Sequence, residues 1–190
     1  MLQLLNSAGA ARIRTATLAD WPLIDAFHRS CSAQALHRRW GRMRIIRRDI
    51  EQLLRHSSCW IALHDTDGAV ALGSAGPVSR QPGVFDLGLQ VADAHQRRGI
   101  GLALARHAAA HARSRGAHTL SVYTEASNLP MLGLLRQIGH PTEFRDGAHL
   151  DVRVPLSGAG AVCPTTPAPA LPGGDLSAVH HAAGQGPDQP

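Results

Sequence analysis

The sequence predicts one mixed α/β domain, on three observations. Between residues 11 and 156, short apolar or alternating segments of strand length are separated by longer segments whose apolar residues recur at helical spacing. The run Gln96–Ala103 joins an alternating segment directly to a long Ala/Leu/Arg-rich segment, as in a strand–turn–helix unit. With 190 residues the chain is long enough to bury a core, and one main domain is the natural expectation.

The N-terminal half of this domain is predicted to hold one strand, then helices, then further strands. Residues 11–15 alternate like a strand, and Thr17–Asp20 is typical of a helix start. Further helical segments follow Ser32 and carry Ile50. Turn-forming residues such as Asp67-Gly68 then separate three predicted strands, at 59–64, 69–79 and 84–91.

The strand at 84–91 determines which side chains share a face. Successive side chains of a strand point to opposite faces, so Leu87 and Leu89 lie on one face. Asp86, Gly88 and Gln90 lie on the other, as expected for residues that face a cleft.

Two more helices and three more strands complete the predicted domain. A helix from residue 100 ends at Gly116, and a strand follows at 118–124. A helix at 130–138 and a hairpin at 142–156 come last. The predicted order is therefore β-α-α-β-β-β-α-β-α-β-β.

The two ends of the chain differ from this domain. Residues 1–10 are expected to form a flexible leader without the basic and apolar regions of a secretory signal. Residues 157–190 are rich in Pro, Gly and Ala with few large apolar side chains, so we expect a disordered tail. The sequence has no run of eighteen apolar residues to span a membrane, and a cytoplasmic location is the default expectation.

The composition indicates which ligands and metal sites the chain is expected to have. The formal net charge is +5, and all nineteen basic residues are arginine, which is consistent with an anionic ligand. The three cysteines are odd in number and widely spaced, which argues against a disulfide framework or a zinc site. His107 and His111 are four residues apart, as metal ligands often are, but no third ligand accompanies them, so no metal is expected.

The Gln96–Ala103 run has the features of a pyrophosphate site. The leading N–H groups of a helix lack partners within the helix, and the helix dipole adds partial positive charge there. Gly99 and Gly101 let the backbone approach a bulky anion, and Arg97 and Arg98 supply donors that fit phosphate oxygens. The alternative is an ordinary strand-to-helix turn.

The spacing of the glycines distinguishes between kinds of phosphate loop. A Walker A loop ends in Gly-Lys-Ser/Thr, and this chain has no lysine. A dinucleotide fingerprint needs a third glycine where Leu104 stands. The remaining pattern, Gln/Arg-x-x-Gly-x-Gly/Ala, resembles that of the GNAT superfamily of acyl-CoA-dependent N-acyltransferases.

This resemblance covers residues 11–156 and implies a GNAT fold, a mixed but mostly antiparallel sheet whose central strands splay and are flanked by helices. It implies acetyl-CoA as co-substrate, with main-chain groups of Leu89, Gln90 and Val91 pairing with the pantetheine arm. It also implies that the pyrophosphate is held by the loop residues Gln96, Arg97, Arg98, Gly99, Ile100, Gly101, Leu102 and Ala103.

A second run, 125–139, is similar to the family's Asn-x-Pro-Met-x-x-Leu-Leu-Arg-x-x-Gly-Phe segment. The similarity implies that Asn128 contacts the cofactor near its pantetheine arm. An N-cap for the following helix is the alternative role, and the two can coexist. The segment departs from the family's pattern at two positions. Leu135 stands where many members have the tyrosine that serves as general acid, and His140 stands where phenylalanine is usual. His140 is a candidate for the acid role, but a hinge at the end of the helix is the favoured interpretation. Tyr123 is not the matching residue.

The Leu-Leu-Arg variant and the Phe27–Trp40 region resemble the bacterial protein-lysine acetyltransferase branch and its stand-alone relatives. A glutamate on the central strand acts there as general base, often through water, and the matching residue here is Asp86. A base is needed because an amine of pKa ~10.4 is protonated at neutral pH. The alternative for Asp86 is a solvated strand residue.

The resulting prediction is an N-acyltransferase that moves an acetyl group to an amine acceptor, either a small molecule or a protein lysine. The alternative is a catalytically silent acyl-CoA sensor. The Arg38–Arg48 cluster with Trp40 has the basic charge of a nucleic-acid face, but one aromatic among scattered arginines disfavours that partner. Homodimer formation is left open.

Overall fold

The structure is a computed structural model that describes residues 2–3 and 11–156. The strands are β1 (Leu2–Gln3), β2 (Arg12–Thr15), β3 (Ser58–His64), β4 (Gly68–Pro77), β5 (Val84–Val91), β6 (Thr119–Glu125), β7 (Thr142–Asp146) and β8 (His149–Pro155). The helices are η1 (Leu18–Asp20), α1 (Trp21–Arg29), α2 (Ala33–Trp40), α3 (Arg47–His56), η2 (Asp93–His95), α4 (Ile100–Ser114) and α5 (Leu129–Arg136).

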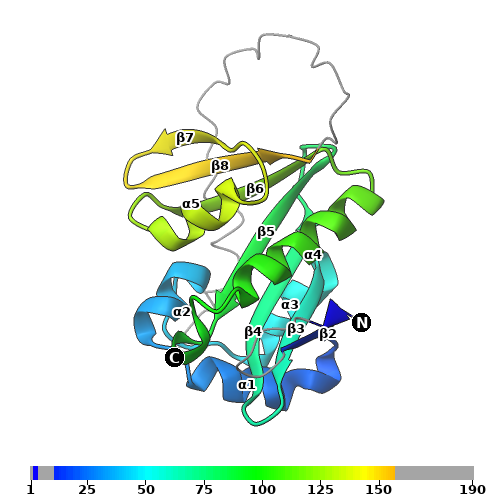
Figure 1. The fold of residues 1–190 in the computed structure, drawn as a ribbon, viewed down its shortest axis with the longest axis vertical. Helices are drawn as coiled ribbons and strands as arrows, with labels where there is room; N and C mark the ends of the chain where they lie inside the picture. The colour runs from blue at the N-terminus through cyan, green and yellow to red at the C-terminus, as the bar shows by residue number, and fades with distance from the viewer. Residues whose placement is uncertain (1, 4–10, 157–190) are drawn as a thin grey trace, which may run out of the picture. The chain divides into compact units, whose positions relative to one another are not determined.

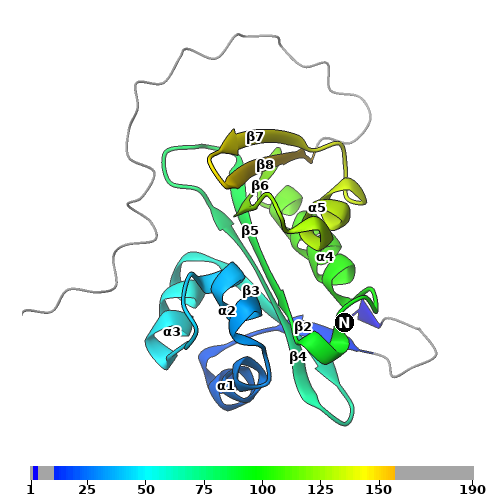
Figure 2. The same cartoon turned by 90° about the vertical axis from the view of Figure 1, so that its left-hand side faces the viewer.

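The strands form one sheet in the order β1-β2-β3-β4-β5-β6-β8-β7. Every neighbouring pair is antiparallel except β5 and β6, which are parallel. Figure 2 shows the sheet between α1–α3 on one side and α4 and α5 on the other. The predicted fold, a mostly antiparallel mixed sheet flanked by helices, is confirmed.

Two apolar clusters hold these layers together, one on each face of the sheet. Side chains alternate between the two faces along β3, so this strand contributes to both clusters. Trp60 and Ala62 face α4, whereas Cys59 and Ile61 face α1–α3. On the first side, α4 presents a row of buried alanines, which lets the helix lie close to the strands. Leu104 of α4, fully buried, packs over the space left by Gly73 of β4.

Gly76 of β4 is a point of close approach between two parts of the backbone. A Cβ at this position would lie 2.5 Å from the His56 carbonyl oxygen and even closer to the Ser57 hydroxyl. The end of α3 therefore passes directly over β4, which only a glycine permits. The bulge in this hairpin is in β4, where Val70 is the extra residue between the pairs Ala62–Ala71 and Leu63–Ala69.

Some boundaries differ from the predicted ones. The segment expected as a flexible leader contributes the short strand β1, which pairs with Arg12 and Ile13 of β2, and the remainder of that segment lies outside the described residues. The predicted tail, 157–190, also lies outside them.

Cys31 and Cys59 are free thiols in the core, and burial raises the pKa of Cys59 to about 12. A search of the described residues for an apolar helix of membrane-spanning length finds none.

Candidate functional site

The two parallel strands separate at one defined point. β5 and β6 pair through only three residues each, and the last pair is Asp86 with Ser121. Beyond it, β6 turns away from β5 toward β8, as Figure 1 shows. The side of β5 from Leu87 to Val91 that faces β6 is therefore without a neighbouring strand in the described part of the chain, as predicted for splayed central strands.

The main-chain groups of β5 divide between β4 and this gap. Residues of an antiparallel pair alternately direct their N–H and C=O groups at the partner strand and away from it. The Ala92 amide donates to the Val70 carbonyl of β4 (2.9 Å), so the alternation also directs the Gln90 main chain at β4. The main chains of Leu89 and Val91 point into the gap, where an extended ligand can pair with them as a strand would.

The 96–103 loop connects this edge to α4. Gln96 Nε2 donates to the Val91 carbonyl (3.2 Å), and Gly99 is the N-cap of α4 with a left-handed φ of 81°. Arg97 also has a positive φ, 60°. Arg97 and Arg98 are exposed and make no hydrogen bond or ion pair to any other described residue, so both guanidinium groups are available to an anion.

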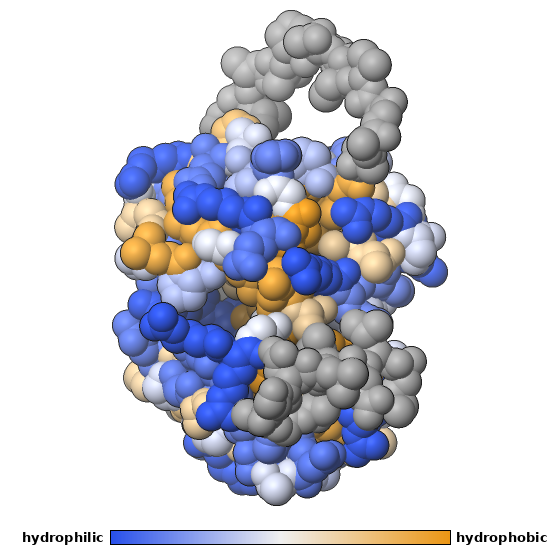
Figure 3. All heavy atoms as spheres, viewed as in Figure 1, coloured by the Kyte–Doolittle hydropathy of each residue, from blue (hydrophilic) through white to orange (hydrophobic). Residues whose placement is uncertain are grey.

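The first turn of α4 places its residues in two environments. Ile100 and Ala103 turn their side chains into the core, so only their backbone can face a ligand. Gly101 lies where α4, α5 and β5 converge, because a Cβ there would be 3.3 Å from Leu134 and 3.5 Å from Val91. Leu102 is half-buried. Apolar side chains gather across the middle of this face of the molecule, with hydrophilic residues above and below (Figure 3).

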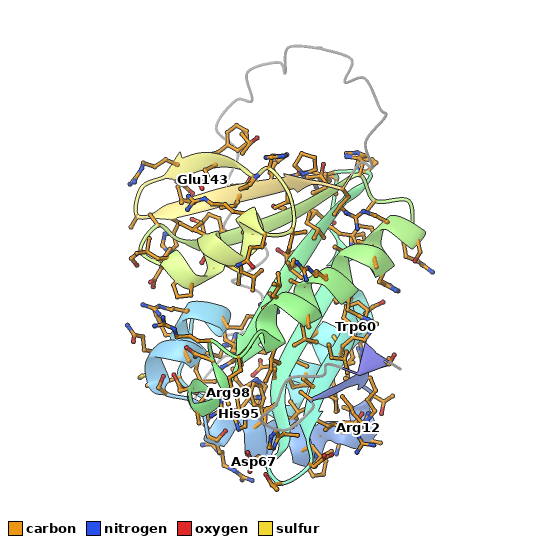
Figure 4. The ribbon with its side chains drawn as sticks, in the orientation of Figure 1. Arg12, Trp60, Asp67, His95, Arg98 and Glu143 are labelled. Carbon is orange, nitrogen blue, oxygen red and sulfur yellow. The ribbon has the colours of Figure 1, made fainter. Side chains whose placement is uncertain are left out.

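The segment before the loop is anchored to two other parts of the fold. His95, in η2, is buried, and its Nε2 lies 3.0 Å from an Asp67 carboxylate oxygen at the β3–β4 turn. Figure 4 shows Asp67, His95 and Arg98 at the same end of the sheet. Asp93 accepts from the Ser32 amide (2.8 Å), which ties η2 to the start of α2. The hydrogen bond from Thr66 contributes most to lowering the pKa of Asp67.

Asp86 is exposed on the face of β5 that lies toward α2, opposite the face that packs on α4. Arg39 of α2 lies near it on the same face. Arg39 Nη2 donates to Ser74 Oγ of β4 (2.9 Å), and its guanidinium lies against Gly88, where a Cβ would overlap it. Burial lowers the pKa of Arg39, and the charge of Asp86 acts in the opposite direction. The carboxylate and the guanidinium thus form an electrostatic pair at the start of the gap.

A buried polar cluster lies next to this pair. Trp40 Nε1 donates to Gln90 Oε1 (2.7 Å), and the His28 ring lies edge-on to Trp40 with 5.5 Å between ring centroids. Both ring nitrogens of His28 and the Gln90 Nε2 atom are buried without a hydrogen-bond partner among the described residues. Burial lowers the pKa of His28 to about 4, so its ring is neutral near pH 7.

Asn128 has the geometry of an N-cap. Its Oδ1 accepts from the Met131 amide (3.4 Å), and its Nδ2 donates to Thr124 Oγ1 of β6 (2.9 Å). Thr124 lies beyond the point at which β6 leaves β5, so Asn128 also lies on the side of the gap that β6 forms. Its cofactor contact stays a prediction.

The residues considered for a general acid lie away from Asp86 or inside the core. Leu135 is completely buried. Tyr123 donates to Asp146 (3.0 Å) and stacks on His149, which directs its hydroxyl toward the β7–β8 hairpin. His140 is exposed after α5.

The arginine cluster and the histidine pair have structural contacts. Arg38 pairs with Glu125 (3.5 Å), Arg42 with Asp49 (2.8 Å) and Arg47 with Glu51 (3.1 Å). His107 and His111 pack edge-on against Trp60 of β3. No group of three or more potential metal-ligating side chains occurs within the part of the chain that the structure describes.

Sequence reasoning missed Arg39 and Ser74. Arg39 belongs to a basic run and has no motif of its own, and Ser74 stands in a run of small residues. The one available signal was Gly88, a glycine inside a strand, which marks a close approach of another group.

Comparisons with known proteins agree with this geometry. The sequence profile described as the acetyltransferase (GNAT) family matches residues 18–140. The GNAT domain of S. lividans PAT has a TM-score of 0.72 at 21% identity, covering 81% of this chain and 96% of that one. None of the curated protein sequences compared with the chain is similar enough to count as a match.

Two further solved structures have the same fold. The ribosomal-protein-S18-alanine N-acetyltransferase of Escherichia coli has a TM-score of 0.62 at 19% identity, covering 79% of this chain and 96% of that one. The yncA protein of Salmonella typhimurium, determined with its cofactor acetyl-CoA, has a TM-score of 0.58 at 20% identity, covering 80% and 98%. At these identities the likeness is one of fold.

Proposed function

The chain belongs to the acetyltransferase (GNAT) family and is an N-acetyltransferase that uses acetyl-CoA, and from this premise we propose that it acetylates a primary amine by direct attack. The amine belongs to a small molecule or to a protein lysine. Asp86 is the proposed general base. The observation that carries the proposal is that the strand separation begins at Asp86, so the base lies next to the edge proposed to hold the thioester.

The residues present fit coenzyme A at three places. The open edge of β5 offers the main-chain groups of Leu89 and Val91 to the amides of the pantetheine arm. Arg97 and Arg98, without partners among the described residues, suit the pyrophosphate together with the first N–H groups of α4. The convergence of α4, α5 and β5 at Gly101 is tight, because a Cβ there would lie 3.3 Å from Leu134, and it brings the backbone of the first turn of α4 next to the open edge of β5.

The proposed reaction needs the amine in its neutral form. An alkyl ammonium of pKa ~10.4 must lose a proton before its nitrogen can attack the thioester carbonyl. Asp86 is exposed on the acceptor side of β5 and accepts that proton, through a water molecule because aspartate is one methylene shorter than glutamate. The carbon–nitrogen bond forms, the carbon–sulfur bond breaks, and coenzyme A leaves as a thiolate. The nitrogen releases its second proton to solvent, which leaves the neutral amide.

We propose that no protein side chain protonates this thiolate. A thiol has a pKa of ~8.5, so near neutral pH the thiolate is a competent leaving group and takes its proton from solvent. Leu135, fully buried in apolar surroundings, has no proton to give. Orientation of the two substrates supplies much of the rate enhancement.

A catalytically silent acyl-CoA sensor is the second candidate, and the replacement of tyrosine by Leu135 favours it. Coenzyme A release from acetyl-CoA separates the two functions. The assay takes polyamines, amino acids, aminoglycosides and lysine peptides as acceptors. An N-acetyltransferase releases coenzyme A with at least one acceptor, whereas a sensor binds acetyl-CoA without turnover.

The role of Asp86 is tested with the acceptor that this panel identifies. We expect Asp86→Asn to lower kcat about a hundredfold and to leave the Kd for acetyl-CoA unchanged, because the base acts on the acceptor alone. Asp65→Asn, at the exposed β3–β4 turn beside Arg12, is the matched control and retains wild-type kcat. Wild-type turnover by Asp86→Asn would exclude Asp86 as the base.

A further inference from the structure

We propose that Arg39 is a positioning residue for the reaction, and that the positive charge of its guanidinium, lodged at Gly88, keeps the Asp86 carboxylate ionised at the proposed acceptor face of β5. This inference rests on the proposed role of Asp86 as general base. Arg39 comes from α2, about fifty residues before Asp86 in the chain, so the pairing exists only in the folded protein.

The backbone of the sheet is shaped to admit this side chain. The Arg39 guanidinium reaches across β4 and β5, donating to Ser74 and lying against Gly88. Any side chain at residue 88 would overlap the guanidinium, and residue 88 is the next residue after Asp86 on the same face of β5. Gly88 therefore creates the place in which the guanidinium sits beside the carboxylate.

The helix that carries Arg39 is fixed on both sides of it. Arg38 pairs with Glu125 of β6, and Trp40 donates to Gln90 of β5. Gly41 ends the helix in a left-handed conformation, with φ of 67°. Three successive side chains of α2 thus contact three strands around the gap, so the guanidinium has a defined position rather than that of a mobile surface arginine.

The charges near Arg39 and Asp86 come from several strands. Asp86 and Arg39 attract one another, and Cys59 of β3 also faces the guanidinium. From β8, Asp151 accepts from Ser121, the register partner of Asp86, and is itself paired with Arg153 (3.0 Å). An arginine beside a carboxylate stabilises the ionised form, the form that a general base requires.

The test is the pH profile of kcat/KM with a single acceptor. As pH falls, log kcat/KM declines with slope one while only the amine is protonated, and with slope two once Asp86 is protonated as well. We expect Arg39→Met to move the change of slope upward by about one pH unit, because the carboxylate loses its cation. We expect Arg39→Lys, which retains the charge, to bring the change of slope most of the way back to its wild-type pH.

A second variant keeps Arg39 but displaces its guanidinium from Gly88. Gly88→Ala places a methyl group where the guanidinium lies, and we expect the same upward movement of the change of slope. Arg42→Met removes an arginine that pairs with Asp49 just beyond α2, and it serves as the control with the wild-type profile. Circular dichroism spectra establish that each variant is folded over the pH range.

Two results would overturn the inference. In one, Arg39→Met and Gly88→Ala lose activity equally at every pH with the change of slope in its wild-type place, which would mean a merely structural role. In the other, both variants keep the wild-type profile. Failure of the proposed function itself gives a different result, because Asp86→Asn would then retain the wild-type rate, which overturns both proposals.

Discussion

Asp86 and Ser121 form the last register pair between β5 and β6, and the open edge of β5 begins at the next residue. A change in strand direction, rather than a loop, therefore brings the proposed acceptor side and the proposed cofactor side together. The Asp86 side chain lies on the face covered by α2, while the main chains of Leu89 and Val91 point into the gap. In the proposed function, one strand thus serves the acceptor with a side chain and acetyl-CoA with its main chain.

Two glycines should respond in opposite ways to the same substitution. Gly76→Ala forces a methyl group onto the His56 carbonyl and the Ser57 hydroxyl, so we expect a loss of about 2 kcal/mol in the free energy of unfolding. Gly133→Ala lies inside α5 with no atom within 4 Å of the new Cβ, so we expect a gain of about 0.5–1 kcal/mol. Urea unfolding measures both changes. A stable Gly76→Ala protein would contradict the close packing of α3 on β4.

Burial of His28 should make stability depend on pH. Its folded pKa, about 4, lies below the ordinary value of 6.5, so the unfolded chain takes up a proton first as pH falls. Stability from this residue is complete above pH 6.5 and is lost between pH 6.5 and 4, by about 3 kcal/mol. His28→Phe retains the ring, removes both unpartnered nitrogens and should flatten this part of the curve. Urea unfolding at several pH values measures the curve, and equal slopes in both proteins would refute the prediction.

Asn128 allows the cap and the cofactor contact to be separated. Asn128→Asp keeps an oxygen that can accept from the Met131 amide, so we expect the free energy of unfolding to change by less than about 0.5 kcal/mol. An ionised carboxylate cannot donate the hydrogen bond of an amide, so the Kd for acetyl-CoA should rise about tenfold. Asn128→Ala should lose about 1 kcal/mol of stability by removing the cap. An unchanged Kd for Asn128→Asp would limit Asn128 to the cap.

Most of the fold could be predicted because its signals are local. The β5 strand occupies the predicted residues, since alternation and flanking turns fix a strand without reference to the remaining chain. The 96–103 loop was recognisable because helix-start chemistry and glycine spacing lie within eight residues. The short strand β1 was missed because two residues carry no periodicity, and pairing with β2 alone defines it.

The acceptor side of the site could not be predicted in the same way. Arg39 reaches Ser74 over a sequence separation of 35 residues, and no local pattern encodes that contact. The basic run from Arg38 to Arg48 reads as a charged surface, yet three of its arginines pair with carboxylates, and Trp40 is engaged by Gln90. Tertiary contacts, rather than composition, decide what these residues do.

The most direct test of the cofactor site is calorimetric titration of acetyl-CoA into three proteins. The wild-type chain should bind one acetyl-CoA, and the Arg97→Ala/Arg98→Ala variant should bind at least tenfold more weakly, about 1.4 kcal/mol, because two phosphate-binding cations are gone. Arg106→Ala, an exposed arginine of α4 outside the loop, should retain the wild-type Kd. Equal affinity in all three proteins, or no binding by the wild-type chain, would contradict the placement of the pyrophosphate on the 96–103 loop.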